Sequence, residues 1–183
     1  GGYRLLALAS QIAASNDKNR VLVAYGDSSV MLGTSLPEGR ITKFDIMSVS
    51  LFSDGAAALV VGGVPTGRER VLFEVHATKS QLIGGNSRKD MYLSYKHDNT
   101  ADNMVSPRVP IFLSKGVSPF AKRVLEGCSV RMDELAFLCH PGGKTILETC
   151  ETTLGLRREQ VQSSWNVMRA HGNMSGSTNL MVM

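Results

Sequence analysis

No apolar run in this sequence approaches the ~20 residues that a membrane-spanning helix needs. Hydrophobic residues make up 43% of the 183 positions, and charged residues make up 20%. These proportions are ordinary for a soluble globular protein, and the length is sufficient for one domain with a substantial core. We therefore expect no membrane partner.

Cysteine is scarce and has no metal-binding spacing. The chain contains only Cys128, Cys139 and Cys150. Their number is odd, and no two of them form the Cys-x-x-Cys pattern of a zinc site or a redox motif. We therefore expect reduced thiols, a cytoplasmic location and no metal site.

An excess of charge of one sign is also missing. The net charge is +4, and the lysines and arginines are scattered rather than gathered in stripes with aromatic residues. Nucleic-acid-binding proteins typically carry a basic stripe or patch, so nucleic acid is not expected as a partner. The sequence also lacks internal repeats and low-complexity segments.

Short apolar runs predict strands. They cover residues 21–25, 56–61, 71–77 and the run before His140. Because residues 21–25 are continuously apolar, we expect this strand to be buried on both faces. The polar stretch 84–110 predicts no element.

Helical periodicity alternates with these runs. The predicted helices cover residues 3–15, 118–126, 144–154 and 158–165. In the second of them, Ser118 is expected as the N-cap and Pro119 as the first helical residue, and Gly155 is expected to end the third. Helices interleaved with buried strands favour an α/β fold.

Two turns near the end of the chain carry the most informative residues. His140 precedes a Pro-Gly-Gly turn, and Asn173 lies in a glycine-flanked turn. A His and an Asn on two turns can converge as donors that hold a carbonyl oxygen as it gains negative charge. Each also has a simpler interpretation: a core histidine bonded to backbone, and an asparagine that only suits left-handed turn geometry.

Four segments together resemble a known family. They are HPGGKTIL at 140–147, GNMSG at 172–176, LFSDGAAA at 51–58 and GGYRL at 1–5. In this order they resemble the chalcone synthase-like type III polyketide synthases. The resemblance implies a thiolase-like, layered α/β/α/β/α fold and a homodimer of the full-length protein. It also implies an acyltransferase that condenses malonyl-CoA with an acyl-CoA starter, with CoA thioesters as substrates and no cofactor.

The resemblance assigns roles to individual residues. His140 and Asn173 are implied to be catalytic, and Phe52 is implied to be the gatekeeper of the CoA tunnel rather than a plain core residue. The implied CoA-binding residues are Gly142, Gly143 and Thr145. The implied cavity-lining residues are Ser29, Leu32 and Ser175. A helix N-cap is the alternative for the last of these, and Asp54 is expected to order the turn after Phe52.

The resemblance also implies parts that the sequence does not contain. The nucleophilic cysteine of the family's Cys-His-Asn triad is expected just before Gly1. A further segment is expected after Met183, where the chain is expected to stop within a strand. The chain is thus expected to be a fragment, incomplete at both ends, with residues 1–80 from the end of the first half and 81–183 from most of the second. The three cysteines that are present are expected to pack in the core.

Two alternatives stay open. One is another thiolase-fold condensing enzyme, either a type III ketoacyl-ACP synthase or a very-long-chain ketoacyl-CoA synthase. The other is a truncated, non-catalytic paralogue. The sequence does not indicate the starter, the number of extensions or the product.

Overall fold

The computed structural model describes residues 2–29, 41, 43–83, 89–95, 97 and 101–183. Its α-helices are α1 (Gly2–Ala14), α3 (Lys43–Leu51), α4 (Val109–Leu125), α5 (Lys144–Leu154), α6 (Gln162–His171) and α7 (Thr178–Met181). Its 3-10 helices are η2 (Met132–Glu134) and η3 (Arg158–Val161). Its strands are β1 (Arg20–Asp27), β2 (Gly55–Gly62), β3 (Met91–Tyr95) and β4 (Ala101–Val105). The result is a mixed α/β arrangement.

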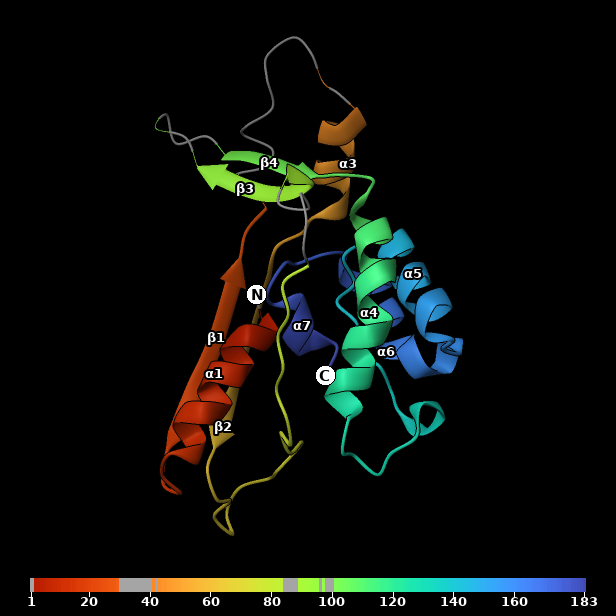
Figure 1. Ribbon diagram of the computed structural model, residues 1–183. Helices are drawn as coiled ribbons and strands as arrows, with labels where there is room; N and C mark the ends of the chain where they lie inside the picture. Colours follow the sequence, from red (N-terminus) through yellow and green to blue (C-terminus); the bar gives the residue numbers. More distant parts are fainter. Residues whose placement is uncertain (1, 30–40, 42, 84–88, 96, 98–100) are drawn as a thin grey trace.

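β1 and β2 form an antiparallel pair, and α1 packs along it (Figure 1). The pair runs from Arg20 opposite Gly62 to Asp27 opposite Gly55. α1 presents the buried residue Ala9 and other small side chains, so the helix axis can approach the strands closely. The helix predicted at 3–15 and the strand predicted at 56–61 are both confirmed by α1 and β2.

The prediction that residues 21–25 are buried on both faces is wrong. These residues do form part of β1, but Leu22 is 69% exposed whereas its neighbour Val23 is only 2% exposed. Leu22 pairs with Val60, which is exposed as well. A continuous apolar run therefore corresponds here to a strand pair with one covered face and one apolar face open to solvent.

A second packing unit lies in the carboxyl-terminal half. Its buried centre consists of Leu147 from α5, Val161 from η3 and Trp165 from α6. Glu151 accepts a hydrogen bond of 2.7 Å from Trp165 Nε1, and the Arg158 guanidinium lies 4.0 Å from the centre of the Trp165 ring. α4 packs against α5 on the outside of this cluster. The predicted helix 144–154, ended by Gly155, is confirmed, and residues 158–165 are helical as η3 and the start of α6.

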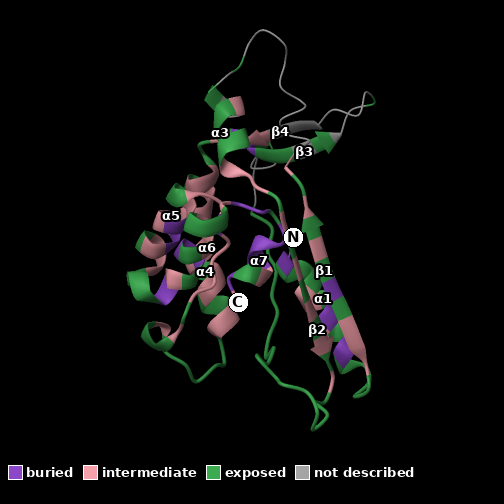
Figure 2. Cartoon of the chain, turned by 180° about the vertical axis from the view of Figure 1, so that it is seen from behind, coloured by how far each residue is buried: buried purple, intermediate pink, exposed green. Residues whose placement is uncertain are grey.

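The short helix α7 lies between these two units (Figures 1 and 2). It contacts both β2 and α1, and the amino terminus of the chain is drawn beside it in both views. The chain ends just after α7, so the expectation of a strand at this position is wrong. Within the described ranges, no helix is long and apolar enough to cross a membrane.

Residues 69–83 are extended, exposed and not assigned to any strand (Figure 2). The strand predicted at 71–77 is therefore absent, and Leu82, near the end of the stretch, is 91% exposed. The run before His140 also forms no strand. A β-strand needs a second strand to pair with, and neither run pairs with one among the described residues; the run before His140 instead bonds to Gln160, through Phe137 N and Leu135 O.

Two further expectations are corrected between residues 84 and 126. The polar stretch 84–110 contains the antiparallel pair β3 and β4. α4 begins at Val109 rather than at Ser118, with Pro110 in its first turn and Pro119 in its interior. A proline fits the first turn of a helix without losing a hydrogen bond, so Pro110 and Pro119 each mark a possible start. The helix begins at the earlier of the two, and Pro119 lies in its interior.

Candidate active site

The turn that contains Asn173 is anchored to the ends of β1 and β2. The Asp27 carboxylate accepts hydrogen bonds from the backbone N–H groups of Gly176 (3.0 Å) and Ser177 (3.2 Å). A Cβ on Gly55 would lie only 2.5 Å from Met174 Sδ, and one on Gly176 would lie 2.9 Å from the Tyr25 ring. These two motif glycines are therefore required by close contacts between the turn and the strands.

The same turn is paired with the loop between α3 and β2. Asn173 and Phe52 form a parallel β-bridge, with Asn173 N donating to Leu51 O and Ser53 N donating to Asn173 O, both at 3.0 Å. The Ser53 hydroxyl also donates to the His171 carbonyl. Two sequence-predicted site residues, Phe52 and Asn173, are thus adjacent through their backbones.

The Asn173 side chain is 4% exposed and has a fixed orientation. Its Oδ1 accepts a hydrogen bond of 3.0 Å from Ser175 N. The amide nitrogen Nδ2 is then the group of Asn173 that can donate to a ligand. Ser175 is exposed and has a positive φ of 54°, and the N-cap of α7 is Ser177, so the alternative interpretation of Ser175 as an N-cap is wrong.

His140 is half-buried at the start of the Pro-Gly-Gly turn. Its Nδ1 lies 2.8 Å from Oδ1 of Asn179, a residue of α7. Burial lowers the pKa of His140 below its ordinary value, and the hydrogen bond with Asn179 opposes that shift. At neutral pH the ring is therefore uncharged, which allows it to accept a proton.

The residues expected to bind CoA lie at the start of α5. Gly142 is close to the His140 ring, since a Cβ there would lie 3.3 Å from Cδ2 of that ring. Gly143 is the N-cap of α5 with a φ of 149°, and Thr145 is exposed in the first turn. A Cβ on Gly143 would lie 3.8 Å from Leu51 Cδ1. The start of α5 therefore meets the end of α3.

Together these contacts form a closed circuit. His140 is joined to Asn179, which follows the Asn173 turn, and the Asn173 turn is joined to Leu51 and Phe52. Leu51 in turn lies beside Gly143, three residues after His140. Gly2, at the amino end of α1, lies close to Asn179 as well, because a Cβ added to Gly2 would be only 2.8 Å from Asn179 Cβ. Segments far apart in the sequence therefore converge at one place.

The cavity-lining candidates are only partly described. Ser29 is fixed by Asp54, whose Oδ1 accepts from Ser29 N at 2.5 Å and from Ser29 Oγ at 2.9 Å. These bonds lower the pKa of Asp54 and tie its turn to the segment after β1, so the role of Asp54 in ordering the turn itself stays a prediction. Leu32 lies outside the described residues.

The three cysteines differ in their surroundings. Cys150 is buried in α5, and Cys139 packs against the Leu147 cluster, as predicted. A hydrogen bond between these two thiols raises the pKa of Cys139, with burial adding to the rise, and it lowers the pKa of Cys150. Cys128 is exposed after α4, so the expectation that it packs in the core is wrong.

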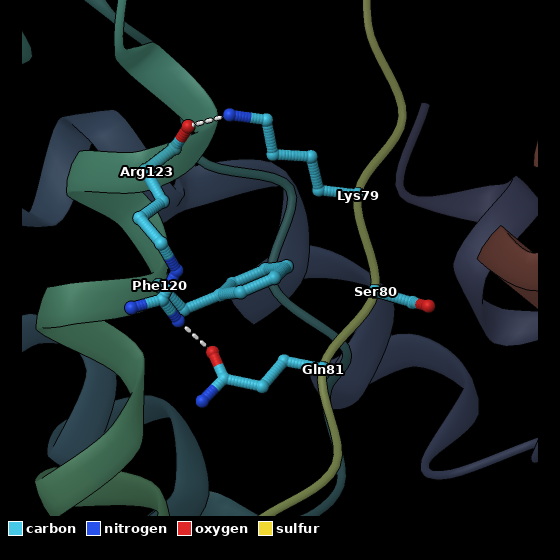
Figure 3. A pocket seen from close by; sticks show the side chains of 5 residues that line it. All are labelled: Lys79, Ser80, Gln81, Phe120 and Arg123. Carbon is cyan, nitrogen blue, oxygen red and sulfur yellow. Dashed lines mark hydrogen bonds between the residues drawn. The ribbon is translucent and has the colours of Figure 1, made fainter.

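Two hollows lie elsewhere, near the carboxyl end of α4. One of about 320 Å³ is lined by Lys79, Ser80, Gln81, Phe120 and Arg123 (Figure 3). Both positively charged side chains of this hollow already make hydrogen bonds within the protein. Lys79 Nζ donates to the Arg123 carbonyl, and the Arg123 guanidinium donates to Gln81 Oε1. No cluster of potential metal ligands occurs in the described part of the chain.

Comparison with known proteins identifies the family. The sequence model of the C-terminal domain of chalcone and stilbene synthases matches residues 80–183. The chain belongs to the chalcone and stilbene synthase family. Type III polyketide synthases A and C of Arabidopsis thaliana are 28% and 30% identical to it over its whole length. The chain spans 46% and 47% of these two proteins, about half the length of each.

A solved structure agrees with this assignment to the chalcone and stilbene synthases. It is the crystal structure of the C-terminal type III polyketide synthase domain of Steely1, a type I/III hybrid from Dictyostelium. It superposes on 99% of this chain with a TM-score of 0.89 and 25% identity, and the chain covers 50% of it.

Three residues that organise the site were not predicted from the sequence: Asp27, Ser53 and Asn179. Asp27 ends a strand and Ser53 precedes an Asp-Gly turn, positions where polar residues are common for purely local reasons. Asn179 directly follows Ser177 and Thr178, and nothing in this polar run distinguishes it from its neighbours.

Proposed function

We propose that the full-length protein containing this chain is a type III polyketide synthase that condenses malonyl-CoA with an acyl-CoA starter. The observation that carries this proposal is the closed circuit of contacts that joins His140, Asn173 and Phe52. A catalytic centre needs its donors on separate elements that meet at one point, and contacts that join the two turns carrying His140 and Asn173 support such an arrangement. Family membership supports the same chemistry.

The proposed chemistry generates negative charge on carbonyl oxygens. A cysteine thiolate holds the starter as a thioester, and malonyl-CoA loses carbon dioxide to leave an enolate. The enolate carbon attacks the thioester carbonyl, a carbon–carbon bond forms, and the thiolate leaves. His140 through Nε2 and Asn173 through Nδ2 donate hydrogen bonds to these oxygens, each contribution being about 2.7–4 kcal/mol of barrier. Phe52 provides an aromatic wall that orients the malonyl group.

The nucleophile is proposed to precede Gly1. The closeness of Gly2 to Asn179 supports this location, since Asn179 is hydrogen-bonded to His140. The raised pKa of Cys139 argues against that thiol as a substitute, because the thiolate is the nucleophilic form.

The remaining assignments complete the proposal. Gly143 and Thr145 at the start of α5 offer backbone N–H groups to the polar arm of CoA. Gly142, whose own N–H is donated to the His140 carbonyl, contacts the same arm through its bare backbone. Ser29, Leu32 and Ser175 line the reaction cavity. The full-length protein is a cytoplasmic homodimer with the layered thiolase architecture, and it acts without a metal or cofactor.

Mass spectrometry provides the first test. The full-length protein is incubated with an acyl-CoA starter, digested and searched for an acylated peptide. We expect the adduct on a cysteine just before Gly1, and none on the 183-residue chain alone. An acyl adduct on Cys128, Cys139 or Cys150 that proceeds to polyketide would overturn the assignment of the nucleophile.

Kinetics of the full-length protein provide the second test. His140→Ala and Asn173→Ala should each slow malonyl-CoA decarboxylation by about a hundredfold or more, because each removes a donor to the developing charge. Phe52→Ala should have a milder effect, and His76→Gln, which alters an exposed histidine, is the control. The scheme fails if His140→Ala decarboxylates at a nearly normal rate while Phe52→Ala abolishes the reaction.

A further inference from the structure

Among the residues that the structure describes, Asn179 is hydrogen-bonded to the His140 ring through its side-chain amide. Its Oδ1 lies 2.8 Å from His140 Nδ1, and Asn179 is only 8% exposed. An amide oxygen can only accept a hydrogen bond, so this contact is a hydrogen bond when Nδ1 carries the proton. In the neutral ring, Nε2 then keeps its lone pair.

We propose that Asn179 is the positioning residue of His140: it selects the tautomer protonated at Nδ1 and turns Nε2 toward the substrate. The assignment of the tautomer stands on the geometry alone. The role of Nε2 toward a substrate rests on the proposed function.

The rigidity of the surroundings makes Asn179 suitable for this role. It lies in α7, and the residues that lead into α7 are fixed by the Asp27 carboxylate and by a 2.7 Å bond from Ser177 Oγ to Met174 O. On another side it is packed against the amino end of α1, where only glycine fits at position 2. A side chain held in this way does not rotate away from the His140 ring.

The selected tautomer suits both stages of thioester chemistry. In the neutral state, Nε2 can take the proton from the thiol of the nucleophilic cysteine, which leaves a thiolate and an imidazolium. The new Nε2–H then points at the substrate carbonyl as a donor. Throughout, Asn179 Oδ1 continues to accept from Nδ1–H, so the ring keeps its orientation while its charge changes.

The test measures the tautomer directly. The full-length protein is labelled with ¹⁵N-histidine, and the ring signals of His140 are assigned from their loss in His140→Gln. We expect Nδ1 to be protonated and Nε2 to be bare in the unsubstituted protein and in Asn179→Asp, whose carboxylate can also accept. In Asn179→Leu, a substitution of similar size without an acceptor, the proton should move to Nε2 in most molecules.

Activity and a matched control complete the experiment. Asn179→Leu should lower kcat for malonyl-CoA decarboxylation by about tenfold to a hundredfold with little change in KM, and Asn179→Asp should retain most of it. Thr178→Val is the control, because Thr178 is a buried neighbour whose hydroxyl has no hydrogen-bond partner among the described residues. It should leave both tautomer and kcat unchanged.

The outcomes are separable. An Nε2-protonated ring in the unsubstituted protein, or a tautomer unaffected by Asn179→Leu, overturns the positioning role. If Asn179→Leu does not fold, the tautomers of the unsubstituted protein and of Asn179→Asp still decide the question. If the tautomers behave as expected but the protein does not decarboxylate malonyl-CoA, the proposed function is wrong and the role of Asn179 in selecting the tautomer stands.

Discussion

The His140 ring lies in an environment that disfavours its charged form. Burial lowers its pKa, and the single hydrogen bond from Nδ1 to Asn179 compensates only in part. A lowered pKa makes the imidazole a weaker base. If the proposed nucleophilic cysteine lies beside it, the ring can still take the proton of that thiol, because the resulting thiolate and imidazolium stabilise each other as an ion pair.

The lowered pKa makes stability depend on pH. The unfolded chain binds a proton at His140 near the ordinary pKa of 6.5, whereas the folded chain does so only at lower pH. The stability contributed by the neutral ring is therefore present above this value and is lost as the pH falls through it. We expect the urea midpoint of the full-length protein to fall between about pH 8 and about pH 5.

Two variants identify the residue responsible for that decrease. His140→Gln should flatten the profile, because it removes the group whose protonation differs between the two states. His76→Gln, at an exposed site, should retain the slope. Equal slopes for His140→Gln and the unsubstituted protein would show that another group causes the pH dependence.

Individual residues were predictable where a local motif contained them. α5 was expected to end at Gly155, and the left-handed conformation of that residue confirms this. Asp54 was expected to order its turn, but its bonds reach Ser29, 25 residues away, which no local motif indicated. The pairing of His140 with Asn179 was not predictable, because 39 residues separate them and no local pattern links an Asn in a short helix to a distant turn. The catalytic roles of His140 and Asn173 stay predictions that the kinetic variants test.

At the level of elements, start and stop signals decided which predictions succeeded. α5 was predicted with its correct bounds, because it follows two glycines and ends at Gly155 in the left-handed conformation. The strand at 71–77 failed since an apolar run does not reveal whether a pairing partner exists. The start of α4 was missed, because Gly116 and Pro119 interrupt its apolar pattern.

The glycine that ends α5 allows a clean test of helix termination. Gly155 has a φ of 65°, and a Cβ added there would meet no atoms within 4 Å, so Gly155→Ala introduces backbone strain without a clash. We expect a loss of about 1 kcal/mol in the free energy of unfolding, measured with urea. Gly67→Ala is the matched control, with equally open space and no positive φ. Equal effects of the two substitutions would contradict the explanation.

The molecule as a whole leaves apolar surface uncovered. Leu22 and Val60 form an exposed pair on the outer face of β1 and β2, and Leu72, Phe73 and Leu82 are exposed along the extended stretch 69–83. Large apolar side chains that are exposed in such number are typical of surfaces that contact other polypeptide. We expect residues outside this chain to cover them in the full-length protein.

A dye that binds apolar surface tests this expectation. The 183-residue chain alone should increase the fluorescence of anilinonaphthalene sulfonate more than an equimolar amount of the full-length protein does. The double variant Leu22→Thr with Val60→Thr should reduce the signal of the chain alone, since threonine keeps the strand propensity and removes apolar surface. Equal fluorescence from the chain and the full-length protein would mean that these faces stay uncovered.

The close glycine contacts around α7 have a genetic consequence. A Cβ on Gly176 would meet the Tyr25 ring, a half-buried side chain that a second mutation can shorten, so Gly176→Ala has a possible suppressor in Tyr25→Ala. A Cβ on Gly2 would lie 2.7 Å from the backbone oxygen of Gly176, an atom that no substitution removes. In a screen for second-site revertants, position 176 should therefore yield partners in β1, whereas position 2 should yield only true reversions.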